Sequence, residues 1–130
     1  MDNIQIIQQV YKNFGEANVA GVLSFFDKDV VWVRPGEPDI PFSGIFKGID
    51  GMGKFLALVA QSIKIKEYYP KQFLSNGDTV VVIGEDTAEV ITTGKSYTTH
   101  WVQQFTLRDG KIISGRAFID TLQVAKAFQP

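Results

Sequence analysis

The second half of the chain limits the fold most strongly. From residue 64 onward apolar and polar residues alternate with a period of two, and three turn pairs interrupt the pattern: Asn76-Gly77, Thr93-Gly94 and Asp109-Gly110. Each pair suits a short hairpin loop, and strands joined by hairpins are antiparallel. We therefore predict four consecutive strands, over about residues 64–74, 79–92, 96–108 and 111–120. Strands of ten or more residues usually bend, so bulges are expected.

The first half has helical periodicity instead. Apolar residues share one stripe at Ile4, Ile7, Val10, Tyr11 and Phe14. Gly15 can end this first helix, Asn18 can cap a second helix, and Asp50 can cap a third. A β-branched run over residues 29–34 predicts an early strand, and three prolines within residues 35–42 predict a loop. The expected fold is α+β, with three N-terminal helices packed on one face of a curved, mixed, mostly antiparallel sheet.

Composition narrows the function classes. The chain has 130 residues, which fits one domain over residues 1–130, and 45% of them are hydrophobic. A net charge of −1 without a run of like charges argues against a nucleic-acid or membrane partner. The absence of cysteine excludes disulfides, thiolate metal sites and cysteine nucleophiles. We see no signal peptide and no apolar run of membrane-spanning length, so a cytoplasmic location is expected.

Four short sequence patterns occur in an order that points to a known fold family. They are Phe26-Asp27-Lys28-Asp29-Val30-Val31-Trp32, then Gly44-Ile45-Phe46-Lys47-Gly48, then Phe105 to Ile112, and finally Phe118-Ile119-Asp120-Thr121. In this order and spacing the whole chain resembles the nuclear transport factor 2-like superfamily, in its SnoaL-like and ketosteroid isomerase-like branch. The resemblance implies a cone-shaped sheet around a helix, with an apolar pocket for a small hydrophobic molecule. It also implies a homodimer that packs through the outer face of the sheet.

The resemblance does not extend to ketosteroid isomerase chemistry. Those enzymes carry a base carboxylate after the first strand, where this chain has Arg34, which cannot act as a base near neutral pH. Gln103 matches the position of their protonated aspartate, whose pKa is raised by its apolar surroundings. A glutamine amide still donates a hydrogen bond, and Tyr11 lies within one residue of the family's tyrosine. We therefore expect Gln103 and Tyr11 in the site but no authentic ketosteroid isomerase activity.

Asp120 is the predicted catalytic carboxylate. In SnoaL-like cyclases and limonene epoxide hydrolase-like enzymes, an aspartate near this place on the last strand does acid/base work. Burial among aromatic side chains would disfavour the charged form of Asp120 and suit it to proton transfer. The alternative is that Asp120 caps or pairs at the end of the sheet, with Thr121 or Arg116 as partner.

Alternation along residues 96–108 assigns the pocket wall. With Gln103 inside, Trp101 and Phe105 also face inward, whereas His100 faces outward unless a bulge shifts the register. The residues assigned to ligand binding are Trp32, Arg34, Phe55, Trp101, Phe105, Phe118 and His100. No metal site is expected, because alternation places Asp86 on the opposite face from Glu85 and Glu89.

Three functions follow from these residues. In the first, the protein is a cofactor-independent isomerase, cyclase or hydrolase in which Asp120 shuttles a proton on an apolar, carbonyl-bearing substrate. Gln103 and Tyr11 would orient that substrate, and Arg34 would attract an anionic group. In the second, the pocket only binds a hydrophobic ligand. In the third, the domain is a dimerisation module with a filled interior.

Overall fold

The computed structural model describes residues 1–36 and 38–130. In chain order these residues form α1 (Asn3–Gly15), α2 (Val19–Leu23), β1 (Phe26–Arg34), β2 (Gly44–Lys47), α3 (Gly48–Ser62), β3 (Ile63–Asn76), β4 (Thr79–Val90), β5 (Ser96–Arg108), β6 (Lys111–Ile119) and α4 (Thr121–Phe128).

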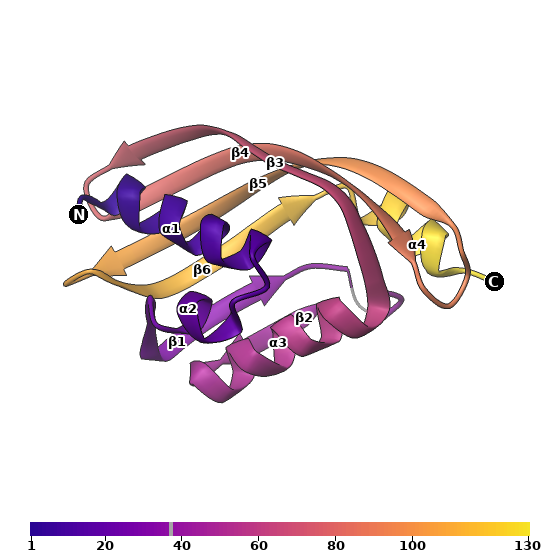
Figure 1. Cartoon of the computed structure of the whole chain (residues 1–130), viewed down its shortest axis with the longest axis horizontal. Helices are drawn as coiled ribbons and strands as arrows, with labels where there is room; N and C mark the ends of the chain where they lie inside the picture. Colours follow the sequence, from indigo (N-terminus) through magenta and orange to yellow (C-terminus); the bar gives the residue numbers. More distant parts are fainter. Residues whose placement is uncertain (37) are drawn as a thin grey trace.

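The strands form one sheet in the order β2-β1-β6-β5-β4-β3. Strands β1 and β6 are parallel, and every other neighbouring pair is antiparallel. Helices α1, α2 and α3 lie along one face of this sheet, while α4 lies at the end near the C-terminus (Figure 1). The predicted α+β class with a mixed, mostly antiparallel sheet is confirmed.

The four long strands match their predicted positions because the turns between them hold the register. Gly77, Gly94, Asp109 and Gly110 all have positive φ, the conformation that tight hairpin turns require. Strand β3 shifts register between Ile65 and Glu67 and again between Pro70 and Gln72, as expected of a bent long strand.

The differences from the predicted elements lie at helix starts and strand edges. Asp50 does not cap α3, which begins at Gly48 with Lys47 at its N-cap and no side-chain cap bond. Strand β1 begins at Phe26, three residues earlier than predicted. Strand β2 and helix α4 were not predicted. The proline-rich segment lies between β1 and β2 as a loop, although Glu37 is outside the described residues.

The inner face of the sheet and the helices enclose the hydrophobic core. Its larger part joins α1, α2 and α3 to β1, β4, β5 and β6, through residues such as Ile7, Val30, Val82 and Phe105. A second cluster around Val124 lies under α4. None of the helices in residues 1–36 and 38–130 is both long and apolar enough to cross a membrane.

Candidate functional site

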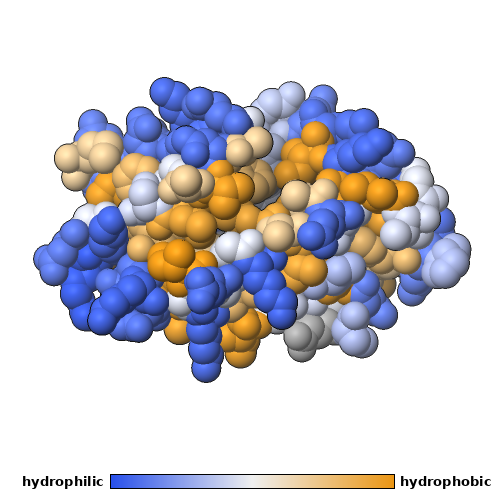
Figure 2. All heavy atoms as spheres, turned by 60° about the horizontal axis from the view of Figure 1, so that its bottom comes forward, coloured by the Kyte–Doolittle hydropathy of each residue, from blue (hydrophilic) through white to orange (hydrophobic). Residues whose placement is uncertain are grey.

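A cavity of about 110 Å³ lies between the helices and the inner face of the sheet. One water needs only about 10–15 Å³ on the same measure, so the space can hold a small organic molecule. The wall is largely apolar, with polar side chains from five elements: Tyr11, Arg34, Tyr68, Asp86 and Gln103. Figure 2, which brings the side bearing α3 towards the viewer, shows apolar side chains gathered across the middle of that face between hydrophilic margins.

Three polar side chains of the cavity are joined in a chain of hydrogen bonds. The hydroxyl of Tyr11 on α1 donates to Oε1 of Gln103 on β5 at 2.6 Å. Nε2 of Gln103 then donates to the hydroxyl oxygen of Tyr68 on β3 at 3.2 Å. Burial raises the pKa of Tyr11 and of Tyr68, so both hydroxyls stay neutral. Since Tyr68 accepts from Gln103, its own proton remains to be donated to a ligand.

Asp86 on β4 is the buried carboxylate of the cavity wall, and its residue is only 7% exposed. It lies directly opposite Tyr68 on β3 and Thr99 on β5, so the three side chains form a row across the sheet. Oγ1 of Thr99 donates to Oδ1 of Asp86 at 2.6 Å. Burial raises the pKa of Asp86, and this outweighs the hydrogen bond from Thr99 and the charge of Arg34, which act the other way. The carboxyl group therefore holds a proton more readily than a solvated aspartate does, which marks it as a candidate for proton transfer.

Arg34 brings a positive charge to the same wall. It ends β1, is 7% exposed, and its Nη1 donates to the carbonyl oxygen of Pro35 at 2.9 Å. The guanidinium lies over the ring of Phe42, 5.1 Å from the centroid, in a cation–π arrangement. Burial lowers the pKa of Arg34, with Tyr97 and Asp86 opposing that effect, but an arginine remains charged.

Two tryptophans form flat aromatic walls because glycines on neighbouring strands leave room for them. A Cβ on Gly84 would lie 2.5 Å from the ring of Trp101, and one on Gly115 would lie 2.7 Å from the ring of Trp32. Trp101 stacks on Tyr68 with centroids 5.1 Å apart, and Trp32 stacks on Phe105 with centroids 5.7 Å apart. The cavity is thus shaped for planar rings.

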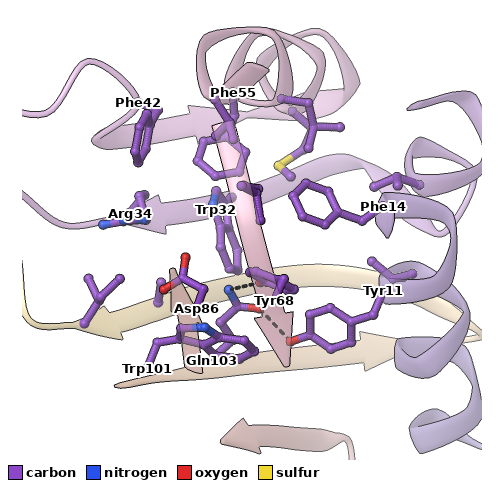
Figure 3. A pocket seen from close by; sticks show the side chains of 18 of the residues that line it. Tyr11, Phe14, Trp32, Arg34, Phe42, Phe55, Tyr68, Asp86, Trp101 and Gln103 are labelled. Carbon is purple, nitrogen blue, oxygen red and sulfur yellow. Dashed lines mark hydrogen bonds between the residues drawn. The ribbon is translucent and has the colours of Figure 1, made fainter. Parts of the chain in front are cut away.

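Most of the predicted site residues meet in this cavity. Those that line it are Tyr11, Trp32, Arg34, Phe55, Trp101, Gln103 and Phe105. Figure 3 shows Arg34 and Tyr11 on opposite sides, with Asp86 and Gln103 between them. Tyr11 and Gln103, which were both predicted to be in the site, are joined by a direct hydrogen bond.

Asp120 does not point into the cavity, in contrast to our expectation. The preceding residue, Ile119, lines the cavity, and the chain then leaves β6 and turns into α4. Asp120 is exposed and caps this helix: its Oδ1 accepts from the backbone N–H of Gln123 at 3.2 Å. This geometry matches the capping alternative, although the partner is Gln123 and not Thr121 or Arg116.

Two predicted ligand contacts also lie on the outer face of the sheet. The His100 side chain is 84% exposed, and its Nδ1 lies 3.4 Å from Oε2 of Glu85. Phe118 is 49% exposed. His100 faces away from the cavity, as alternation predicted, since no bulge interrupts the pairing of β5 with β4, and neither His100 nor Phe118 lines the cavity.

From the sequence, Asp86 was considered only in order to exclude a metal site, and Tyr68 was not assigned to the cavity. The inward positions of β4 are otherwise small and apolar: Val80, Val82, Gly84, Ala88 and Val90. A carboxylate in such a row is the pattern that marks a functional candidate. Within residues 1–36 and 38–130, no group of three or more His, Asp or Glu side chains is placed to hold a metal ion.

The comparisons with known proteins agree with this architecture. The SnoaL-like domain family matches residues 7–115. An NTF2-like protein from Burkholderia xenovorans LB400 is 30% identical, with 98% of this chain and 95% of that chain covered and a TM-score of 0.90. TerC, crystallised with polyporic acid, is 30% identical over 98% of both chains, with a TM-score of 0.84.

A third structure shows the fold alone. An NTF2-like protein of unknown function from Burkholderia pseudomallei K96243 is 24% identical over 100% of both chains, with a TM-score of 0.91. None of the curated proteins matches this chain.

Proposed function

Because this chain belongs to the SnoaL-like domain family, within the nuclear transport factor 2-like superfamily, we propose that its cavity is an active site for cofactor-independent acid/base chemistry. The substrate is a small, largely apolar carbonyl compound, and the reaction moves a proton on a carbon next to the carbonyl group. The observation that carries the proposal is Asp86, a buried carboxylate with a raised pKa in an otherwise apolar wall.

The neighbouring side chains supply complementary roles. Asp86 takes the proton from carbon, and the electron pair of the broken C–H bond moves onto the carbonyl oxygen as an enolate. Tyr68 lies directly opposite Asp86 and has a proton to donate to that oxygen. Gln103 and Tyr11 hold the Tyr68 hydroxyl in place. Return of the proton from Asp86 to another carbon completes an isomerisation. Alternatively, the enolate carbon attacks a second carbonyl carbon to form a ring, the π electron pair of that carbonyl moves onto its oxygen, and this oxygen takes the proton back from Asp86.

This arrangement differs from the ketosteroid isomerase pattern in where the base stands. The end of β1 carries Arg34, and the carboxylate comes from β4 instead. A cavity with this polar row favours a small-molecule function over a dimerisation module with a filled interior. The crystals of TerC with polyporic acid support small-molecule binding in a relative of this chain.

Hydrogen–deuterium exchange tests the proposal without knowledge of the natural substrate. In D₂O, the protein should catalyse the incorporation of deuterium next to the carbonyl of 2-tetralone, an enolisable ketone whose ring is fused to benzene, as followed by NMR. Asp86→Asn should slow this exchange by about 100-fold or more, the usual contribution of a general base. The matched variant Asp120→Asn should leave the rate within about twofold, because asparagine is an equally good cap.

Two results would overturn the proposal: no exchange above buffer with the wild type, or an unchanged rate in Asp86→Asn. A separate binding measurement distinguishes a non-catalytic pocket protein. The chain has two tryptophans, Trp32 and Trp101, and both line the cavity, so intrinsic fluorescence reports its occupancy. Saturable quenching by polyporic acid without any exchange would favour ligand binding alone.

The homodimer is a further proposal, supported by apolar side chains on the outer face of the sheet. Ile83 and Phe118 are 38% and 49% exposed there. Sedimentation velocity at micromolar concentration should give a dimer, and Phe118→Glu should shift it towards monomer. A monomeric wild type would contradict this proposal.

A further inference from the structure

The cavity holds a buried cation that no acid of the described wall pairs with directly. Arg34 is 7% exposed, and no ion pair within 4.0 Å involves it among the described residues. Asp86 is the acid of the described wall. Its charge influences the pKa of Arg34 from beyond ion-pair distance, and its carboxylate already accepts a hydrogen bond from Thr99. A buried charge without a close counter-ion is costly, and this cost is recovered when an anion binds.

Building on the proton-transfer function above, we propose that the ligand of this cavity is an aromatic oxyanion. Its carboxylate or ionised enol group pairs with Arg34, while its ring lies between the aromatic walls. The planar guanidinium presents several N–H donors in a fixed fork, which matches two oxygens of a delocalised anion.

The surroundings of Arg34 hold it ready for such a ligand. The hydrogen bond to the Pro35 carbonyl and the face of the Phe42 ring restrict where the guanidinium can lie. Little side-chain freedom is then lost on binding. Among the residues that the structure describes, the Pro35 carbonyl is the one hydrogen-bond acceptor of the guanidinium, and the bond uses Nη1, so the other N–H groups of the fork can face a ligand.

The aromatic walls indicate the chemical nature of the part of the ligand that extends away from Arg34. The rings of Trp32 and Phe105 are within 17° of parallel, and those of Tyr68 and Trp101 are within 25°. An anion at Arg34 therefore leads into a space bounded by flat rings, where an aromatic ring is better accommodated than a bulky aliphatic group. Figure 3 shows Asp86 between Arg34 and the Tyr11–Gln103 pair, so the ligand's ring would pass the proposed base.

Calorimetric titration with two matched pairs of compounds tests this inference. 2-Naphthoate should bind about tenfold or more tighter than neutral 2-naphthamide, the scale expected of a charge-assisted hydrogen bond. 2-Hydroxy-1,4-naphthoquinone, ionised at pH 7, should likewise bind tighter than 1,4-naphthoquinone. The pair with the larger preference identifies whether a carboxylate or an ionised enol is the better group.

Variants assign the preference to one side chain. Arg34→Met should abolish the preference for 2-naphthoate while 2-naphthamide binds as before, and Arg34→Lys should keep part of it. Arg116→Met, on the outer face, should behave as the wild type. The inference is overturned if the wild type binds the amide as tightly as the acid, if it binds neither pair, or if Arg34→Met retains the preference.

The outcome is separable from that of the proposed function. Deuterium exchange of 2-tetralone uses a neutral compound and depends on Asp86, whereas the anion preference depends on Arg34. If deuterium exchange is observed but anions are not preferred, only the inference about the ligand is overturned. If anions are preferred but no exchange is observed, only the proposed catalysis is overturned.

Discussion

On β4 the neighbouring carboxylates of Glu85 and Asp86 face opposite sides of the sheet and have opposite surroundings. Lys71 donates to Glu85 at 2.6 Å on the outer face, and this hydrogen bond is the main cause that lowers the pKa of Glu85. Asp86 faces the cavity, where burial raises its pKa. The pKa values of these two adjacent carboxyl groups thus shift in opposite directions, because one face of the strand is solvated and the other is apolar.

The same contrast recurs on both neighbouring strands. On β5, Thr99 is 1% exposed and donates to Asp86, whereas the hydroxyl of Thr98 shares a hydrogen bond with the hydroxyl of Thr87 on the exposed face. On β3, Tyr68 lines the cavity and Tyr69 is 48% exposed. Position relative to the cavity, and not residue type, therefore marks the candidate chemistry. Each adjacent pair also supplies a matched inside and outside variant.

The largest expected difference is between the two tyrosines. Tyr68→Phe should slow deuterium exchange of 2-tetralone by about 100-fold, the typical loss when one hydrogen-bond donor to a developing oxyanion is removed. Tyr69→Phe should exchange at the wild-type rate. When the exchange rate is measured at several concentrations of the ketone, Tyr68→Phe should lower the maximal rate, while the half-saturating concentration should change less. An equal effect of both variants would contradict the role assigned to Tyr68.

Gly84 tests whether the inner face tolerates any added atom. An alanine Cβ there would meet two ring atoms of Trp101 at 2.5 and 2.6 Å and the carbonyl of Tyr69 at 2.6 Å. Gly84→Ala should lower the free energy of unfolding by about 2 kcal/mol, as overpacking usually does.

The control for this variant is Gly53→Ala on α3, where the nearest side-chain atom would be 4.0 Å away. That change should stabilise the protein by about 0.5 kcal/mol, because alanine is the better helix former. Urea unfolding followed by tryptophan fluorescence measures both. A wild-type stability for Gly84→Ala would show that Trp101 does not lie against β4.

The two threonines should differ less. Thr99→Val keeps the shape but removes the donor to a buried carboxylate, so the free energy of unfolding at pH 7 should fall by about 1.5 kcal/mol. Thr98→Val should change it by about 0.5 kcal/mol or less, as is usual for exposed sites. Equal losses in the two variants would mean that the bond to Asp86 has no special weight.

The four strands joined by hairpins could be predicted from the sequence, because each turn pair fixes the register of its two strands locally. Helix α4 was missed although Asp120 and Gln123 have the spacing of a helix-capping pair, the same spacing as Asp2 and Gln5 at the start of α1. Reading Asp120 as the end of a strand concealed that pattern. A capping aspartate and a catalytic aspartate have the same sequence appearance, and only the direction of the chain after Ile119 separates them.

The candidate site was predicted in part. Alternation placed Gln103, Trp101 and Phe105 on the inner face and His100 on the outer face, as the structure has them. The same rule had already set Asp86 apart from Glu85, but it was applied only to exclude a metal. Burial of a single carboxylate depends on helices far away in the sequence, so its raised pKa could not follow from the local pattern.

The two carboxylates should affect stability in opposite directions as pH changes, and this is the smallest effect we expect. A buried acid with a raised pKa costs stability once the unfolded chain ionises, above about pH 4. Asp86→Asn should therefore be more stable than the wild type at pH 7, with the gain vanishing towards pH 3.

Glu85 reverses the sign of this dependence. Its lowered pKa gives stability that is present above about pH 4 and lost as the pH falls through the folded-state pKa. Glu85→Gln should then be slightly less stable than the wild type at pH 7, and the difference should shrink towards pH 3. Urea unfolding of the wild type and both variants between pH 3 and 8 measures the two curves. Curves of the same sign would mean that Asp86 is not desolvated, which would remove the physical basis of its proposed proton transfer.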